Sequence, residues 1–186
     1  MTNIIFSISI FCLLVILIFS LPSFFSEKFR FFPPPALNTW QYYLFWALFR
    51  CFFIGLIVLS FVEFDNDLGS VTGIIGLVLL ALGIGFSAYL SYSYLGKTNS
   101  YGGKYGLKIN GFYRWSRNPI YVFSIVGMVG WGLLVNSNFV WVLLGLWCVL
   151  YILAPFVEEP WLEQQYGQEY ILYREKTPRF IGIVKE

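Results

Sequence analysis

Long apolar runs, separated by short polar links, take up most of this sequence. The runs cover residues 4–21, 39–62, 70–95, 119–135 and 139–157. A helix rises about 1.5 Å per residue, so roughly 20 apolar residues cross the hydrocarbon core of a bilayer. Only 12% of the 186 residues are charged, against roughly 25% in soluble proteins. The pattern predicts an all-α integral membrane protein with five transmembrane helices.

The last two apolar runs are joined only by Asn136-Ser137-Asn138. A link this short forces two helices into an antiparallel hairpin. Beyond the hairpin, Pro160 can start another helix, and bulky side chains then recur at spacings of four, four and three: Leu162, Tyr166, Tyr170 and Tyr173. This is the period of one helical face. We therefore expect a cytoplasmic C-terminal amphipathic helix.

Basic residues indicate the orientation of the chain. Eleven of the twelve Lys and Arg residues lie in the first loop, the third loop and the tail. Short basic loops stay on the cytoplasmic side of a membrane. We expect a multi-pass protein with its N-terminus outside and its C-terminus in the cytoplasm. Residues 96–118 and 158–186 then share one cytoplasmic face, where they can form a single active site.

The chain divides into two regions under this interpretation. Residues 1–95 hold three transmembrane helices and a Pro-rich first loop, and residues 96–186 hold a polar loop, the hairpin and the C-terminal helix. Arg50 is the one basic residue within an apolar run, where a guanidinium is costly. A carboxylate partner, a polar cavity and a shifted helix boundary are three explanations that remain open.

Histidine is absent from the sequence, and the three cysteines lie far apart. Imidazole is the usual zinc ligand and the usual general base near neutral pH, so we expect no metal. A net charge of +2 is too small to indicate a nucleic-acid partner. The available chemistry belongs to carboxylates, Arg, Lys, Tyr and a cofactor with its own reactivity.

Arg117 directly precedes a predicted helix start at Asn118 and Pro119. Asn is a good N-cap and Pro is favoured at the first helical position. Free N–H groups, the positive end of the helix dipole and a guanidinium together favour a bound carboxylate or phosphate. The alternative is that Arg117 reaches lipid headgroups. Two adjacent carboxylates, Glu158 and Glu159, end the fifth run on the same cytoplasmic side.

The segments GFYRWSRNPIY and EEPWLEQQYGQEYILY, taken in this order, carry a resemblance. Together they resemble the C-terminal half of the integral-membrane methyltransferases that include isoprenylcysteine carboxyl methyltransferases and phospholipid N-methyltransferases. The likeness covers residues 96–180. It implies S-adenosylmethionine as the methyl donor and a lipophilic small molecule or membrane lipid as the acceptor.

The resemblance also implies site residues. Carried over position by position, the cofactor-binding residues are Tyr105, Gly106, Leu107, Lys108, Tyr113, Asn118, Pro119, Ile120, Tyr121 and Glu158. The residues expected to act in catalysis are Arg117, Tyr121 and Glu159. Methyl transfer from a sulfonium needs mainly orientation of donor and acceptor. Glu159, Tyr113 and Tyr121 are the candidates for a general base, where the acceptor has a proton to lose.

Two positions depart from the prenylcysteine enzymes. Asn118 replaces a histidine of their Arg-His-Pro motif, and Ala154 replaces an arginine that those enzymes use for substrate. The main hypothesis is S-adenosylmethionine-dependent methyl transfer to a lipophilic acceptor, as in the isoprenylcysteine carboxyl methyltransferases. The alternatives are a phospholipid N-methyltransferase and a non-catalytic membrane scaffold. A third alternative is a reductase, which would need a nicotinamide cofactor, and the sequence contains no recognisable motif for one.

Overall fold

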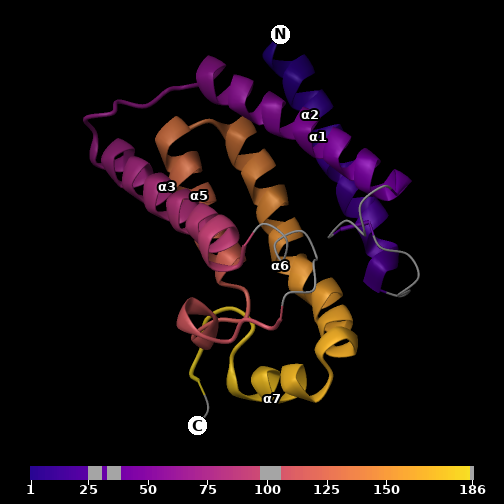
Figure 1. Cartoon of the computed structure of the whole chain (residues 1–186). Coiled ribbons are helices and arrows are strands. Elements are labelled where there is room, and N and C mark those ends of the chain that lie inside the picture. Colours follow the sequence, from indigo (N-terminus) through magenta and orange to yellow (C-terminus); the bar gives the residue numbers. More distant parts are fainter. Residues whose placement is uncertain (25–30, 33–38, 97–105, 185–186) are drawn as a thin grey trace.

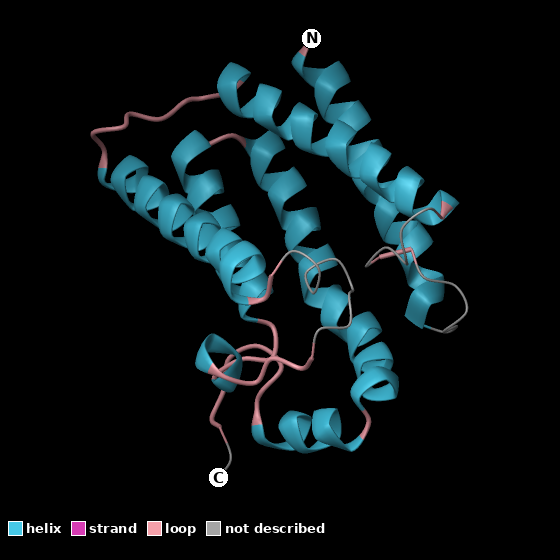
Figure 2. Ribbon diagram, viewed as in Figure 1, coloured by secondary structure: helices cyan, strands magenta, loops and turns pink. Residues whose placement is uncertain are grey.

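The computed structural model describes residues 1–24, 31–32, 39–96 and 106–184. Within these ranges every regular element is a helix and no strand is present, as Figure 2 shows. The all-α prediction is therefore confirmed for these ranges. The prolines of the first loop, at 33–35, and Tyr105 lie outside them.

α1 (Thr2–Ser20) and α2 (Trp40–Val62) pack against each other (Figure 1). α1 continues into the short 3-10 turn η1 (Leu21–Phe24). The backbone N–H of Tyr42 donates a 3.3 Å hydrogen bond to Oγ1 of Thr39, so Thr39 caps α2. Side chains of both helices are fully buried where the pair packs: Leu13, Ile16, Phe52, Leu56 and Leu59.

α3 (Val71–Tyr89) is the next apolar helix, and it ends in a π-helical turn, η2 (Leu90–Tyr94). The chain then forms a loop that contains the 3-10 turn η3 (Gly111–Arg114). α5 (Pro119–Val135) follows and packs along α3. Figure 1 shows the two helices side by side.

Glycines set the separation of α3 and α5. A Cβ on Gly83 would lie 2.2 Å from the backbone nitrogen of Gly127, and one on Gly76 would lie 2.9 Å from the carbonyl oxygen of Gly130. Small residues of this kind let membrane helices approach closely. Gly76 and Gly83 therefore serve helix packing. Gly85 differs, because a Cβ there would meet no atom within 4 Å.

α5 and α6 (Asn138–Tyr166) form the expected antiparallel hairpin (Figure 1). Asn136 turns the chain in the left-handed region, at φ 57°, a conformation that Asn tolerates better than most residues. α6 is longer than the fifth apolar run. It passes through Pro155 and Pro160 and ends at Tyr166, with Gly167 as its C-cap.

The expected C-terminal helix is consequently divided. No helix begins at Pro160, because α6 runs through this residue. Gly167, at φ 56°, then separates α6 from α7 (Gln168–Lys176). Proline removes one N–H donor from a helix, but the burial of neighbours such as Ala154 and Glu159 favours a continuous helix. The bulky side chains of the predicted face still meet in one cluster: Leu162, Tyr166, Tyr170 and Tyr173.

Four helical segments are long and apolar enough to cross a membrane: Thr2–Ser23, Trp40–Val62, Val71–Tyr94 and Asn138–Tyr166. α5 is equally apolar but has only 17 residues. The length of α5 therefore leaves the number of spans at four or five. Figure 1 places the N-terminus near the end that carries the α5–α6 turn, and α7 with the C-terminus at the opposite end.

Candidate functional site

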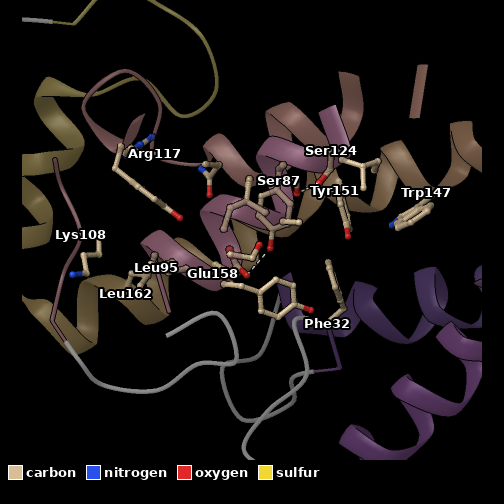
Figure 3. Close-up of a pocket in the computed structure, with 18 of the residues that line it drawn as sticks. Phe32, Ser87, Leu95, Lys108, Arg117, Ser124, Trp147, Tyr151, Glu158 and Leu162 are labelled. Carbon is tan, nitrogen blue, oxygen red and sulfur yellow. Dashed lines mark hydrogen bonds between the residues drawn. The ribbon is translucent and has the colours of Figure 1, made fainter. Parts of the chain in front are cut away.

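A cavity of about 900 Å³ lies where α2, α3, α5 and α6 face one another, and it continues to the loop before α5 and to α7. Ligand sites typically measure about 300–1,000 Å³, so the cavity has room for more than one small ligand. Figure 3 shows Lys108 and Arg117 toward one side of it, Trp147 toward the other, and Glu158 between them.

One end of the cavity collects most of the residues expected from the sequence. Those that line it are Gly106, Leu107, Lys108, Tyr113, Arg117, Asn118, Ile120, Tyr121 and Glu158. Pro119 is buried at the start of α5 without lining the cavity, and Glu159 is also absent from the lining. Tyr105 falls outside the described residues. The two polar segments that were expected to share a face therefore meet, and we call their meeting place the polar end.

Tyr121 and Glu158 connect the two arms of the hairpin. The hydroxyl of Tyr121, in the first turn of α5, donates a 2.7 Å hydrogen bond to Oε1 of Glu158 on α6. The dashed line beside Glu158 in Figure 3 marks this bond. Because the phenol is the donor, the carboxylate of Glu158 is the group of this pair that can accept a cation or a further proton.

Arg117 is a buried cation with spare donors. Its side chain is 8% exposed, and Nη2 lies 3.1 Å from Oε1 of Glu159. Nε and Nη1 are buried without a hydrogen-bond partner within the described chain. A buried donor left unsatisfied costs about 1–3 kcal/mol or more when charged. Arg117 also lines the cavity, so an anion bound there would satisfy these donors.

The N-terminus of α5 lies beside this guanidinium. Asn118 occupies the N-cap position as predicted, but its side chain makes no capping bond. Its Nδ2 instead donates a 2.9 Å hydrogen bond to the carbonyl oxygen of Arg179. The first turn of α5 is thus left without a side-chain cap, which keeps the positive end of its dipole available to a ligand.

Glu159 is held by two arginines rather than facing the cavity. Arg179 donates to it through Nε at 2.8 Å and through Nη2 at 2.7 Å, and Arg117 contacts it from the other side. The bond to Glu159 raises the pKa of Arg179 above its usual value. Both oxygens of the Glu159 carboxylate thus bond to arginine nitrogens, which suits this residue for positioning the arginines.

Tyrosines form the wall between the loop and α7. Tyr113 stacks on Tyr94 with ring centroids 5.9 Å apart, and the hydroxyl of Tyr173 donates a 2.6 Å hydrogen bond to the backbone oxygen of Tyr113. Burial raises the pKa of Tyr113, and the charge of Glu158 raises it further. This phenol therefore stays protonated at neutral pH, and it is a poor general base.

The other end of the cavity is apolar and aromatic, and we call it the aromatic arm. α3 contributes smaller residues to its walls, including Leu80, Ala81, Ile84 and Gly85. The large side chains come from α2, α5 and α6: Phe45, Trp46, Phe49, Phe53, Met128, Trp131, Trp147 and Tyr151. The hydroxyls of Ser87 on α3 and Ser124 on α5 pair at 2.7 Å along the cavity. Among the described lining residues, the charged ones are Lys108, Arg117 and Glu158, and all three belong to the polar end.

The sequence did not predict the surroundings of Arg50, Gly85 and Arg179. Arg50 is exposed on α2 and does not line the cavity, which leaves the polar-cavity explanation without support. Gly85 does line it, so this glycine faces the ligand space instead of α5. Arg179 was missed altogether. Its only signal was its charge, because its contacts depend on how the tail folds back.

In the ranges that the structure covers, no group of three or more His, Cys, Asp or Glu side chains lies close enough to hold a metal ion.

Comparison with known proteins gives one family. A family model described as phospholipid methyltransferase matches residues 71–169, just over half of the chain. The matched range includes α3, the loop, α5 and α6, and therefore most of the polar end. No curated protein and no solved structure gave a match. With the resemblance confirmed and the multi-pass helical architecture in agreement, the chain belongs to the phospholipid methyltransferase family.

Proposed function

We propose that this protein transfers a methyl group from S-adenosylmethionine to a lipophilic acceptor held in the aromatic arm. The observation that carries the proposal is Arg117, a buried guanidinium with two unpartnered nitrogens at the uncapped start of α5. The cavity that it lines is charged at one end and apolar at the other. This polarity suits a zwitterionic nucleoside cofactor beside a membrane-soluble substrate.

The residues present fit this cofactor. Nε and Nη1 of Arg117 and the first turn of α5 would hold the methionyl carboxylate. Glu158, on the opposite side of the polar end, would hold the ammonium group. Tyr113 and Leu107, which line the polar end, offer apolar surface for the adenine. When bound, the cofactor supplies an activated methyl group on a sulfonium.

The work left to the protein is orientation and exclusion of water. Within the polar end, Tyr121 and its partner Glu158 adjoin the aromatic arm through the contact of Tyr121 with Tyr151, and donor and acceptor would meet there. Tyr121 fixes the rotamer of Glu158 by hydrogen bonding, and the aromatic rings would keep the reacting atoms dry. We propose Arg117 and Tyr121 as residues that contact the cofactor, and Glu159 as a residue that positions Arg117.

The acceptor is a lipophile without a carboxylate in this proposal. Ala154 is 1% exposed in the apolar core and does not line the cavity, so it offers no cation at the place where the prenylcysteine enzymes carry an arginine. Phospholipid amines, which fit the family description, are the acceptors that this site suits best.

The membrane topology forms part of the proposal. We place five spans in the membrane, with α5 as the short fourth span, the N-terminus outside and the polar end in the cytoplasm. In support, the described basic residues other than Arg50 lie in the loop before α5 or in the tail. α7 would lie at the cytoplasmic membrane surface.

Binding of S-adenosylhomocysteine to the full chain in lipid nanodiscs, measured by calorimetry, tests the cofactor. Transfer of labelled methyl groups from S-adenosylmethionine to phosphatidylethanolamine in the same nanodiscs then tests the acceptor. Binding without transfer to phosphatidylethanolamine or to any component of a membrane extract would favour the non-catalytic scaffold. Absence of binding would remove the proposed function.

A further inference from the structure

The C-terminal segment 177–180, which we call the strap, lies against the loop that precedes α5. The backbone N–H of Arg117 donates a 2.9 Å hydrogen bond to the carbonyl oxygen of Pro178. Asn118 Nδ2 and Ser116 Oγ both donate to the carbonyl oxygen of Arg179, at 2.9 and 3.4 Å. Three consecutive residues of the loop are thus tied to the strap, which follows the range matched by the family model.

The side chain of Arg179 makes a second connection to the same place. Both Nε and Nη2 bond the carboxylate of Glu159, and the guanidinium lies 4.0 Å from the ring centroid of Phe156. Two parallel bonds fix the plane of a carboxylate far better than one. Arg179 is 32% exposed at its side chain, whereas Glu159 is only 7% exposed. A surface residue therefore determines the orientation of a buried one.

Glu159 passes this constraint on to Arg117. Its Oε1 accepts from Arg179 Nε and also contacts Nη2 of Arg117. With Oε2 taken by Arg179, Arg117 pairs with Glu159 through Nη2 only, and its Nε and Nη1 have no partner within the described residues. The cluster of two arginines and one carboxylate carries one surplus positive charge. Without Arg179, Glu159 and Arg117 would remain as a one-to-one ion pair. The carboxylate of Glu159 could then rotate and bond more than one nitrogen of Arg117.

We propose that Arg179 is a positioning residue of the cofactor site, and that the strap holds Arg117 ready for the methionyl carboxylate. This inference rests on the proposed function, because it assigns the carboxylate subsite to Arg117. It extends the cofactor site to a segment beyond α7 that never reaches the cavity itself.

The test compares two ligands in the full chain in nanodiscs. S-adenosylhomocysteine carries the carboxylate, and 5′-methylthioadenosine lacks the whole amino-acid part. Arg179→Met should weaken S-adenosylhomocysteine about tenfold, the loss of one charged hydrogen bond, and leave 5′-methylthioadenosine within twofold. Arg179→Lys, which keeps the charge without the paired bonds, should fall between. Arg174→Met is the matched control, because Arg174 pairs with Glu163 at the surface, with both side chains over a third exposed.

The effects of Arg179→Met and Arg117→Met should also fail to add, since both remove the same subsite. Equal weakening of both ligands, or no weakening of either, would overturn the inference while leaving cofactor binding intact. Should Arg179→Met not fold, Arg179→Lys carries the same comparison. Failure of the unmodified protein to bind S-adenosylhomocysteine would remove the proposed function, and this inference with it.

Discussion

The hydroxyl of Tyr121 donates a 2.7 Å hydrogen bond to Oε1 of Glu158 and so joins α5 to α6 beside the cavity. In the proposed site, Glu158 would receive the ammonium group of the cofactor. Glu158→Gln should therefore weaken S-adenosylhomocysteine about tenfold. Tyr121→Phe keeps the carboxylate and should cost only a few-fold. Glu163→Gln, a surface carboxylate in an ion pair, should change nothing. A calorimetric titration in which Tyr121→Phe loses more affinity for S-adenosylhomocysteine than Glu158→Gln does would contradict these roles.

Arg117→Met tests the anion subsite directly. The substitution removes the two unpartnered donors of the guanidinium and should lower the affinity for S-adenosylhomocysteine at least tenfold. Folding should survive, because the variant also removes the cost of burying that charge. Tryptophan fluorescence during heating checks folding independently of binding. Unchanged affinity in a folded variant would place the carboxylate elsewhere.

Gly85 offers a way to block the aromatic arm alone. A Cβ at Gly85 would meet no atom within 4 Å, and the residue lines the cavity. Gly85→Leu should fill acceptor space and reduce methyl transfer to a lipid severalfold, with the affinity for S-adenosylhomocysteine unchanged. Gly145→Leu is the control, since Gly145 is equally open but is not part of the cavity. Equal activity of the two variants would argue against this place for the acceptor.

The glycine contact between α3 and α5 predicts a stability difference. A Cβ on Gly83 would come within 2.2 Å of a backbone nitrogen, so Gly83→Ala should destabilise the fold by about 1–3 kcal/mol or more. Gly85→Ala, two residues away on the open face, should instead stabilise it by about 0.5–1 kcal/mol, the helix preference of Ala over Gly. Thermal unfolding in one detergent compares the pair, and similar midpoints would contradict the packing.

Alkaline pH should destabilise the protein through its buried tyrosines. Burial is the first cause that raises the pKa of Tyr113, Tyr170 and Tyr173. In the unfolded chain these phenols lose their protons near pH 10. Above that pH the folded state binds more protons than the unfolded state, so its stability falls as pH rises. The unfolding midpoint of Tyr173→Phe should fall less steeply between pH 10 and 11 than that of the unmodified chain.

Local rules account for the features that could be predicted. Apolar run lengths predicted the helices, and the preferences of Asn and Pro at helix starts placed α5 at Asn118 and Pro119. The short link predicted the hairpin. Because these signals lie within a few residues of each other, they do not depend on the rest of the fold.

The misplaced features depend on tertiary contacts. Pro160 is a helix breaker in isolation, yet α6 continues through it beside the buried Glu159. The hydrogen bond between Asn118 and Arg179 joins residues 61 positions apart, and no local sequence pattern predicts it. Gly83 and Gly85 lie two residues apart in the same apolar run, but they are on different faces of α3. Gly83 contacts α5, whereas Gly85 lines the cavity.

The two ends of the cavity come from different parts of the chain. The matched range 71–169 carries the polar end, whereas much of the aromatic arm belongs to α2, which precedes that range and packs with α1. The aromatic arm therefore combines residues from outside the matched range, on α2, with residues from inside it, on α5 and α6. Under the proposed function, a change in α2 would alter the wall of the acceptor space and leave the residues proposed to bind the methyl donor unchanged.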